Sequence, residues 1–198
     1  LSYSLLNNTD VIPGVPGKHN RSNAAAALAV ALHLGIARED ALKAIHSFHG
    51  VSRRFEKVGE VNDIVIYDDY AHHPTEVTST LEAAATLNRR IIAIFQPHRY
   101  SRTQQLGAQF GDSFGAADVV IITELYSAFE EPIEGVSGRV VYDAVRQASP
   151  DKKVLFASDL ATAQSMATEI ARSGDAIFTI GAGDITKLSR QLLANLGS

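Results

Sequence analysis

The chain has 198 residues, of which 45% are hydrophobic and 20% charged, and its formal net charge is −4. This length allows one large domain or two small domains of a globular protein. The negative charge argues against a nucleic-acid or anionic-membrane partner, and no apolar run approaches the roughly 20 residues that span a bilayer. The chain has no cysteine, which excludes disulfide frameworks and thiolate chemistry, and we expect a cytoplasmic protein.

The first 50 residues are predicted to be mainly helical. The opening residues LSYSLL indicate a strand cut from a larger protein, so we expect the chain to be a piece of one, with a possible strand at 1–12. A loop rich in Pro and Gly follows. Helices are then expected at 22–35 and 38–48, the first with Asn20 or Ser22 as its N-cap.

The character of the sequence changes near Ser52, which predicts a domain boundary between residues 1–51 and 52–198. Beyond it, strands alternate with helices of about 10–15 residues, a pattern that predicts a Rossmann-like α/β fold with a mostly parallel sheet and flanking helices. The runs 91–95 and 119–122 are apolar without alternation, as in strands buried on both faces. The expected strands are 56–61, 63–68, 90–95, 118–122, 153–156 and 175–180, and the expected helices are 75–88, 102–114, 137–148, 159–172 and 184–196.

Polar turns follow four of the predicted strands. They are DDYAHHP at 68–74, QPHRYSRT at 96–103, ELYSAFEEP at 124–132 and GAGD at 181–184. The carboxyl ends of parallel strands meet at one edge of a sheet, where ligands bind in open α/β folds. We therefore expect the four turns to converge on one rim and to form the functional site there.

The turn at 96–103 is a candidate anion site. Arg99 and Arg102 are three residues apart at a predicted helix start, so both can face one way, with His98 beside them. A guanidinium binds a carboxylate or phosphate in a bidentate fork, and a helix N-terminus adds to the preference for an anion. The alternative is a solvated charge pair that balances Glu124 or Glu130.

The turn at 68–74 contains two acids and two histidines. Adjacent histidines in such a turn point apart, so His72 and His73 are not expected to share a metal ion, and we predict no metal site. A general-base or hydrogen-bonding role for one of them is better supported. Asp68 or Asp69 could cap the next helix or pair with an arginine, and an acid at this place can equally accept from ribose hydroxyls.

For the remaining candidate residues, a ligand-binding role and a purely structural role are about equally supported. Asn20 and Asn23 are three residues apart at a helix start, where an amide can bind an adenine edge or simply cap the helix. Arg53 and Arg54 could reach a phosphate or could lie on the surface. The glycines at 181–183 let a backbone approach a ligand, although many turns use glycine only for geometry.

The set of motifs resembles the Mur ligase family. PGKHNRSNAAAALAVALHLGI, GVSRRFE, YDDYAHHPTEV, FQPHRYSRT and GAGDI occur in the family's order and spacing, and the resemblance covers about residues 13–198. DDYAHHPTE and FQPHRYSRT are most similar to the members that join L-alanine to UDP-N-acetylmuramate. The resemblance implies that residues 1–51 are the tail of a central ATP-binding domain and 52–198 a carboxyl-terminal Rossmann-like domain.

The resemblance also implies a reaction. Members of this family use ATP and Mg²⁺ to convert the muramoyl carboxylate to an acyl phosphate, which the amino group of L-alanine then attacks, a step in making peptidoglycan precursors. The sequence contains no G-x-x-x-x-G-K-[ST] phosphate loop, so we expect the isolated chain to be inactive and most Mg²⁺ ligands to lie elsewhere. L-alanine, UDP-N-acetylmuramate and ATP are the implied partners, with no nucleic acid and no membrane.

Four residues are implied to bind the nucleotide. Asn20 and Asn23 match asparagines that contact adenine, and Arg54 matches an arginine that reaches the ATP phosphates. Asp69 matches the acid that holds the ribose. The resemblance thus favours the nucleotide reading at these positions.

Five residues are implied to form the amino-acid site. Tyr70 and His72 match residues that line the alanine pocket, with His72 near the attacking amine as the catalytic candidate. His98, Arg99 and Arg102 match the group that binds the alanine carboxylate. Together they predict a shared pocket between neighbouring strands.

Two further functions stay open beside this one. A murein-peptide recycling ligase of the same superfamily would share several of the motifs, although FQPHRYSRT favours the alanine-adding members. A stand-alone, non-catalytic domain that binds nucleotides or anions is the alternative from another class. A dinucleotide-dependent oxidoreductase is disfavoured because no G-x-G-x-x-G turn follows the first strand. The sequence departs from the family pattern at Phe129, where we expect a smaller residue such as glycine.

Overall fold

The structure of the protein, a computed structural model, describes residues 11–197, which divide into two compact units between Ser52 and Arg53. Most of the strand expected at 1–12 lies outside the described residues. No helix in the described part is both long enough and apolar enough to cross a membrane. The two units are taken in turn.

The first unit contains two helices, α1 (Lys18–His33) and α2 (Arg38–His46). The prediction that Asn20 or Ser22 caps the first helix is wrong, because α1 begins at Lys18 with Gly17 as its N-cap. Gly17 has φ of 111°, a conformation that glycine adopts without strain. Asn20 lies in the first turn, where its Nδ2 donates to the carbonyl oxygen of Pro16 at 2.6 Å.

The second unit is built on a sheet of six strands in the order β1-β2-β6-β3-β4-β5. β1 pairs antiparallel with β2, and all other pairs are parallel, which confirms the predicted mostly parallel α/β sheet. The strands are β1 (Glu56–Val61), β2 (Ile64–Asp69), β3 (Arg90–Phe95), β4 (Val119–Thr123), β5 (Lys153–Ala157) and β6 (Asp175–Ile180).

Helices connect the parallel strands, and one of them differs from expectation. A single helix was predicted at 102–114, but the segment forms a short α-helix followed by a 3₁₀-helix that begins at Gly107. Glycine disfavours a continuous helix, and here it permits close packing on α5 (Gly138–Ala148): a Cβ at Gly107 would lie 2.6 Å from a methyl of Val140. The helices are α3 (Pro74–Ala85), α4 (Tyr100–Leu106), η2 (Gly107–Phe114), α5 (Gly138–Ala148), α6 (Leu160–Ile170) and α7 (Thr186–Leu196).

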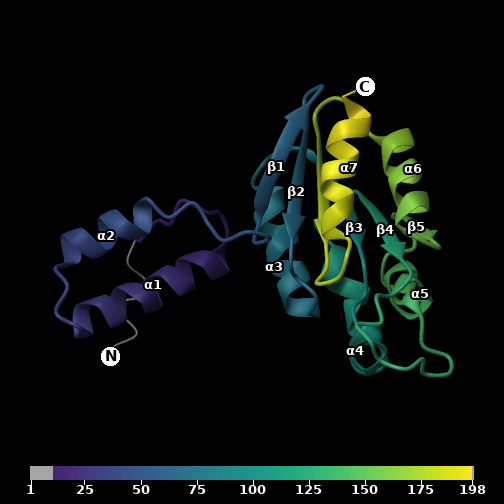
Figure 1. Ribbon diagram of the computed structural model, residues 1–198, viewed down its shortest axis with the longest axis horizontal. Coiled ribbons are helices and arrows are strands. Elements are labelled where there is room, and N and C mark those ends of the chain that lie inside the picture. Colours follow the sequence, from purple (N-terminus) through teal and green to yellow (C-terminus); the bar gives the residue numbers. More distant parts are fainter. Residues whose placement is uncertain (1–10, 198) are drawn as a thin grey trace. The chain divides into compact units, whose positions relative to one another are not determined.

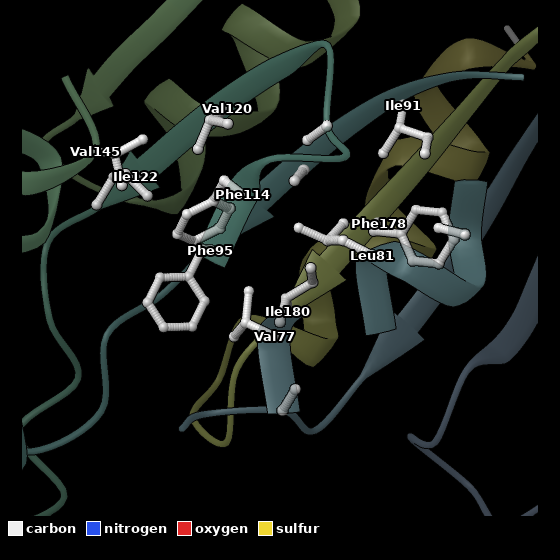
Figure 2. Packing of buried hydrophobic residues seen from close by; sticks show 14 of the residues in the cluster. Val77, Leu81, Ile91, Phe95, Phe114, Val120, Ile122, Val145, Phe178 and Ile180 are labelled. Carbon is white, nitrogen blue, oxygen red and sulfur yellow. The ribbon is translucent and has the colours of Figure 1, made fainter. Parts of the chain in front are cut away.

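Helices cover both faces of the sheet, and alternate strand residues face opposite layers. Figure 2 shows one face, where side chains of α3, η2 and α5 meet Phe95, Phe178 and Ile180. On the other face Ile92 and Ile94 pack against α6 and α7, which lie side by side in Figure 1. Because the central strands are buried on both faces, their sequences are apolar without alternation.

The strand order determines which turns are neighbours. β6 lies between β2 and β3, and Ile180 is in register with Asp69 on one side and Phe95 on the other. The turns that follow β2, β6 and β3 therefore start at the same level of the sheet. An isolated bridge between His98 and Tyr126 joins the turn after β4 to the turn after β3.

Candidate active site

A pocket of about 360 Å³ lies at this rim, and we call it the rim pocket. Residues from the turn after β2, from the turn after β3 with helix α4, and from the turn after β6 line it. They are Tyr70, His72, His98, Arg99, Ser101, Arg102, Gln105, Leu106 and Ala182. The five residues predicted to form an amino-acid site are thus brought together.

Tyr70 and His72 project from the turn after β2. The ring of His72 meets that of Tyr70 edge-on, with centroids 5.3 Å apart, and its Nδ1 lies 2.9 Å from the carbonyl oxygen of Tyr70. A carbonyl can only accept, so Nδ1 of His72 carries the proton and donates it. In the neutral ring Nε2 then keeps its lone pair, and no group in residues 11–197 forms a hydrogen bond to it, so it can accept a proton from a ligand.

His73 has a different role from its neighbour. It is the N-cap of α3 and forms a capping box with Glu76, whose Oε2 accepts from the backbone amides of His72 and His73. Burial alone raises the pKa of Glu76, but these bonds and the nearby charge of Arg54 bring it below its ordinary value. The two histidines therefore diverge, and residues 11–197 contain no group of three side chains that could hold a metal ion.

His98 is held as a neutral ring. Its Nδ1 lies 3.1 Å from Nη1 of Arg102, and because a guanidinium only donates, Nδ1 of His98 must accept. The proton of the neutral ring is then on Nε2. Burial, followed by the positive charges of Arg102 and Arg99, lowers the pKa of His98 to about 4. His98 also stacks on Tyr126, with ring centroids 5.7 Å apart.

Arg99 is already paired. Its Nη1 lies 3.4 Å from Oε1 of Glu130, one of the two partners considered for the solvated pair. Glu130 also accepts from the hydroxyl of Ser101 at 2.7 Å and from its backbone amide at 2.9 Å. The amide group that was expected to attract a ligand anion at this helix start is thus occupied by a carboxylate of the chain itself.

Arg102 differs from Arg99 in this respect. Its Nη1 contacts the ring and the carbonyl oxygen of His98, at 3.1 and 3.5 Å. Among residues 11–197, no carboxylate lies within ion-pair distance of Arg102. A guanidinium on the pocket wall with no acidic partner can bind the carboxylate of a ligand.

The two adjacent aspartates are both buried and both engaged inside the unit. Oδ2 of Asp69 accepts from the amide of Phe55 at 2.7 Å, and Oδ1 accepts from the amide of Ala71 at 2.8 Å. Burial raises the pKa of Asp69 above its ordinary value, although these bonds oppose the rise. Asp69 does not line the rim pocket, and a ribose hydroxyl would have to reach a carboxylate that is 4% exposed.

Asp68 belongs to a separate group that we call the Asp68 cluster: Asp68, Arg53, Thr179 and Thr186. Nε of Arg53 donates to Oδ2 of Asp68 at 3.1 Å, and the hydroxyls of Thr179 and Thr186 donate to its two oxygens at 2.8 and 2.7 Å. Nη2 of Arg53 donates to the carbonyl oxygen of Gly181 at 2.6 Å. Of the two readings for Arg53, the phosphate ligand and the surface residue, the structure supports neither.

The remaining nucleotide candidates are spread over the chain. Arg54 is half-exposed, lies 5.4 Å from the centroid of the Tyr70 ring and is 3.9 Å from Glu76. Such an exposed pair contributes little, so Arg54 can exchange Glu76 for a phosphate. Asn20 and Asn23 lie on α1 in the first unit and are not among the residues of the rim pocket.

The pocket contains lining residues that sequence reasoning missed. Ser101, Gln105 and Leu106 join Arg102 on α4, and they recur at helical spacing from the predicted start of that helix. That periodicity was the available signal. Ala182 lies between two glycines that pack against Gln96, so the glycines themselves serve close packing.

Comparisons with known proteins bear on this site. Residues 53–183 match the family model described as "Mur ligase, glutamate ligase domain". UDP-N-acetylmuramate–L-alanine ligase from Desulforamulus reducens is 46% identical over 183 residues, which is 92% of this chain and 39% of that protein. The enzyme of the same name from Dictyoglomus turgidum is 44% identical over 91% of this chain and 39% of that protein. The chain thus spans about two-fifths of the length of these curated relatives.

Solved structures agree with the sequence relatives. UDP-N-acetylmuramate–alanine ligase from Thermotoga maritima has a TM-score of 0.75 at 32% identity, covering 91% of this chain and 38% of that one. A murein peptide ligase from Psychrobacter arcticus has a TM-score of 0.70 at 29% identity, covering 97% of this chain and 40% of that one. With most of the second unit matched by the family model, the chain belongs to the Mur ligase family.

Proposed function

We propose that this chain supplies the amino-acid site of an ATP-dependent ligase that joins L-alanine to UDP-N-acetylmuramate. The observation that carries the proposal is the guanidinium of Arg102, without an acidic partner in residues 11–197, in a pocket whose other walls hold two histidines and a tyrosine. The names of the relatives in Desulforamulus and Dictyoglomus support the same reaction. A cytoplasmic location and a role in peptidoglycan precursor synthesis are part of the proposal.

In this proposal Arg102 binds the carboxylate of L-alanine. A bidentate guanidinium–carboxylate pair fixes the orientation of the amino acid as well as its position. His98, with its pKa lowered to about 4, is neutral at pH 7 and accepts from Arg102, so it holds the guanidinium toward the pocket without competing for the carboxylate. Arg99 contributes less directly, since Glu130 already engages it.

His72 would receive the amino end of the same ligand. The α-ammonium group must lose a proton before its nitrogen can attack a carbonyl carbon, and a neutral imidazole nitrogen can accept that proton. Nε2 of His72 is available because Nδ1 is tied to the carbonyl oxygen of Tyr70. We assign His72 the role of positioning the amine and accepting its proton.

ATP supplies the activation of the muramoyl carboxylate as an acyl phosphate in this proposal. Arg54 fits a phosphate ligand because it is half-exposed and weakly paired. Asp69 as the ribose acceptor and Asn20 and Asn23 as adenine ligands stay predictions. Residues 11–197 offer no group of three or more acidic or histidine side chains for Mg²⁺, so its ligands are proposed to lie mostly in the rest of the complete gene product.

A murein peptide ligase is the second candidate, supported by the structural neighbour from Psychrobacter. In a peptide substrate the amino-terminal residue carries an amide in place of a free carboxylate. An unpaired guanidinium beside the amine site therefore favours a free amino acid. A non-catalytic anion-binding domain is the third candidate, and for the 198 residues alone we predict no ATP turnover.

The test uses the complete gene product that contains this chain. With ATP and UDP-N-acetylmuramate, we expect ADP release that depends on L-alanine. An alanine-initiated tripeptide should compete poorly with L-alanine in this assay. If the tripeptide is the preferred substrate, the protein is a murein-peptide recycling ligase instead. Binding of L-alanine to the 198-residue chain, followed by NMR on the arginine side chains, tests the site without ATP; its absence would count against the amino-acid site itself.

A further inference from the structure

Four arginines lie at or beside the rim, and all but one have an acidic partner. Within the described part of the chain, Arg102 is the one without a carboxylate at ion-pair distance. The rim pocket therefore presents a single uncompensated guanidinium. The pairs are Arg53 with Asp68 at 3.1 Å, Arg54 with Glu76 at 3.9 Å, and Arg99 with Glu130 at 3.4 Å.

Only one of these pairs involves an arginine that lines the pocket, and its acid is held by several bonds. Oε1 of Glu130 accepts from the hydroxyl of Ser101 and from Arg99, and Oε2 accepts from the amide of Ser101. The Glu130 side chain is 24% exposed and that of Arg99 48%. The amide of Arg99 also donates to the carbonyl oxygen of Tyr126 at 2.8 Å, which ties the loop of Glu130 to the turn of Arg99.

Two of the groups at the pocket, Glu130 and His98, have a fixed charge near neutral pH. The hydrogen bonds from Ser101 hold the pKa of Glu130 below its ordinary value, so its carboxylate is ionised. Burial and the neighbouring cations keep His98 neutral, as noted above. The positive charge of Arg99 and the negative charge of Glu130 cancel, so the charge that attracts a ligand carboxylate comes from Arg102.

We propose that Glu130 determines substrate specificity by charge: it neutralises Arg99, so the pocket accepts an amino acid with one carboxylate and disfavours dicarboxylic amino acids. This inference rests on the proposed amino-acid site and adds the group that sets its charge selectivity. A second carboxylate in the ligand would meet a guanidinium that is already engaged and the negative charge of Glu130 beside it. Repulsion of that kind is how a site rejects a close competitor.

The decisive variant is Glu130→Gln, which keeps the shape of the side chain and removes its charge. The amide oxygen of Gln can still accept from Arg99, but the charge of that guanidinium is no longer neutralised. We expect the ratio of kcat/KM for L-aspartate to that for L-alanine to rise on the order of tenfold in the complete gene product, the effect of one charged hydrogen bond. The dissociation constant of L-aspartate relative to that of L-alanine, measured for the 198-residue chain by NMR titration, should fall correspondingly.

Two matched variants separate charge from loop structure. Glu131→Gln makes the same chemical change at the next residue, which is exposed and does not line the pocket, and should leave the ratio unchanged. Arg99→Gln combined with Glu130→Gln returns the pocket to one guanidinium. If charge is responsible, the double variant recovers the wild-type preference for L-alanine even though the contact with Arg99 is lost.

The outcomes distinguish this inference from the function it rests on. If the wild-type chain binds no α-amino acid, the proposed function fails and this inference fails with it. If the wild type binds L-alanine but Glu130→Gln leaves the preference unchanged, the inference is overturned while the function stands. A rise in the ratio that the double variant does not reverse assigns Glu130 a structural role only, which also overturns the inference.

Discussion

Two polar groups at the carboxyl edge of the same sheet differ in one respect, whether their charges are matched. In the Asp68 cluster the carboxylate of Asp68 receives three side-chain hydrogen bonds, from Arg53, Thr179 and Thr186. In the rim pocket the guanidinium of Arg102 forms hydrogen bonds with His98, a neutral residue, and has no acidic partner among residues 11–197. Both groups combine an arginine with the end of a buried strand, so their residue types alone do not separate them.

The difference indicates what each group is for. A buried charge with all its partners inside the chain stabilises one arrangement of the turns and has nothing to offer a ligand. A charge without an acidic partner contributes little to folding but can bind an external anion. We therefore expect substitutions in the Asp68 cluster to change the free energy of unfolding, and substitutions at Arg102 to change substrate binding.

The largest effect is expected for Asp68→Ala. This change leaves Arg53, whose side chain is 23% exposed, without its acidic partner and removes an acceptor of the buried Thr179 hydroxyl and of the half-buried Thr186 hydroxyl. Breaking such a pair from one side costs about 3–5 kcal/mol of the free energy of unfolding. Urea denaturation of the 198-residue chain measures it. The matched control is Asp151→Ala at an exposed aspartate, for which we expect a change within about 0.5 kcal/mol.

Arg102→Ala should instead weaken substrate binding and leave the free energy of unfolding almost unchanged. Loss of the unpaired guanidinium should raise the KM for L-alanine by about 10–100-fold, the equivalent of one or two charged hydrogen bonds, with the KM for ATP nearly unchanged. Steady-state kinetics on the complete gene product measure both constants, and denaturation of the chain should show little loss of stability. Arg102→Lys should also bind L-alanine poorly, because an ammonium group cannot form the fork.

An arginine far from the pocket provides the control for Arg102→Ala. Arg190, an exposed arginine on α7, offers the same change to alanine away from the pocket and should leave both constants at wild-type values. An Arg102→Ala variant that loses ATP and L-alanine binding equally would remove Arg102 from the amino-acid site. A large loss of stability would place it with the Asp68 cluster instead.

The strands and the rim were predictable because they depend on patterns that the sequence shows directly. The runs at 91–95 and 119–122 are too apolar to face water on either side, so they require a sheet covered on both faces. Once the sheet is parallel, the turns after the strands must share an edge. That argument sufficed to bring His72, His98 and Arg102 to one place before any contact was known.

The pairing of individual charges was not predictable, because it depends on distances between turns that are far apart in sequence. Glu130 lies 31 residues from Arg99, and the sequence could offer it only as one of two possible partners. Arg53 reaches Gly181 across 128 residues, which no local pattern encodes. The break at Gly107 was missed because a glycine within a helical pattern is often tolerated, and only packing against α5 decides.

The pH dependence of the free energy of unfolding tests the neutral state of His98 in the rim pocket. His98 has a pKa of about 4 in the folded protein, below the value of about 6.5 expected in the unfolded chain. Between these pH values only the unfolded chain binds the proton, so the free energy of unfolding falls as pH falls from 6.5 to 4, and this loss is complete below that range. Allowing for partial exposure, we expect a loss of about 1–2 kcal/mol.

The variant His98→Asn isolates this contribution from other groups that titrate in the same range. Its Oδ1 can still accept from Arg102, but the side chain does not protonate. Urea denaturation at several pH values should give a flatter profile for the variant than for the wild type. Parallel profiles would mean that His98 is not the group responsible and that its ring is more accessible to protons than its contacts indicate.

The smallest expected effect concerns Phe129, at the tip of the loop that carries Glu130. Its side chain is 99% exposed, and its backbone has φ of 68°, a left-handed conformation that a bulky residue adopts at a cost. Phe129→Gly removes that strain but gives the unfolded chain more freedom, so the net gain in stability should be at most about 1 kcal/mol. Phe129→Ala, which keeps a Cβ and the strain, is the matched control and should show no gain.

The same variant also shows whether the strained tip affects specificity. If Phe129→Gly stabilises the chain and leaves the preference for L-alanine over L-aspartate intact, the strain at the tip is separate from the charge pairing beside it. If the preference drops, the strained tip helps to hold Glu130 against Arg99.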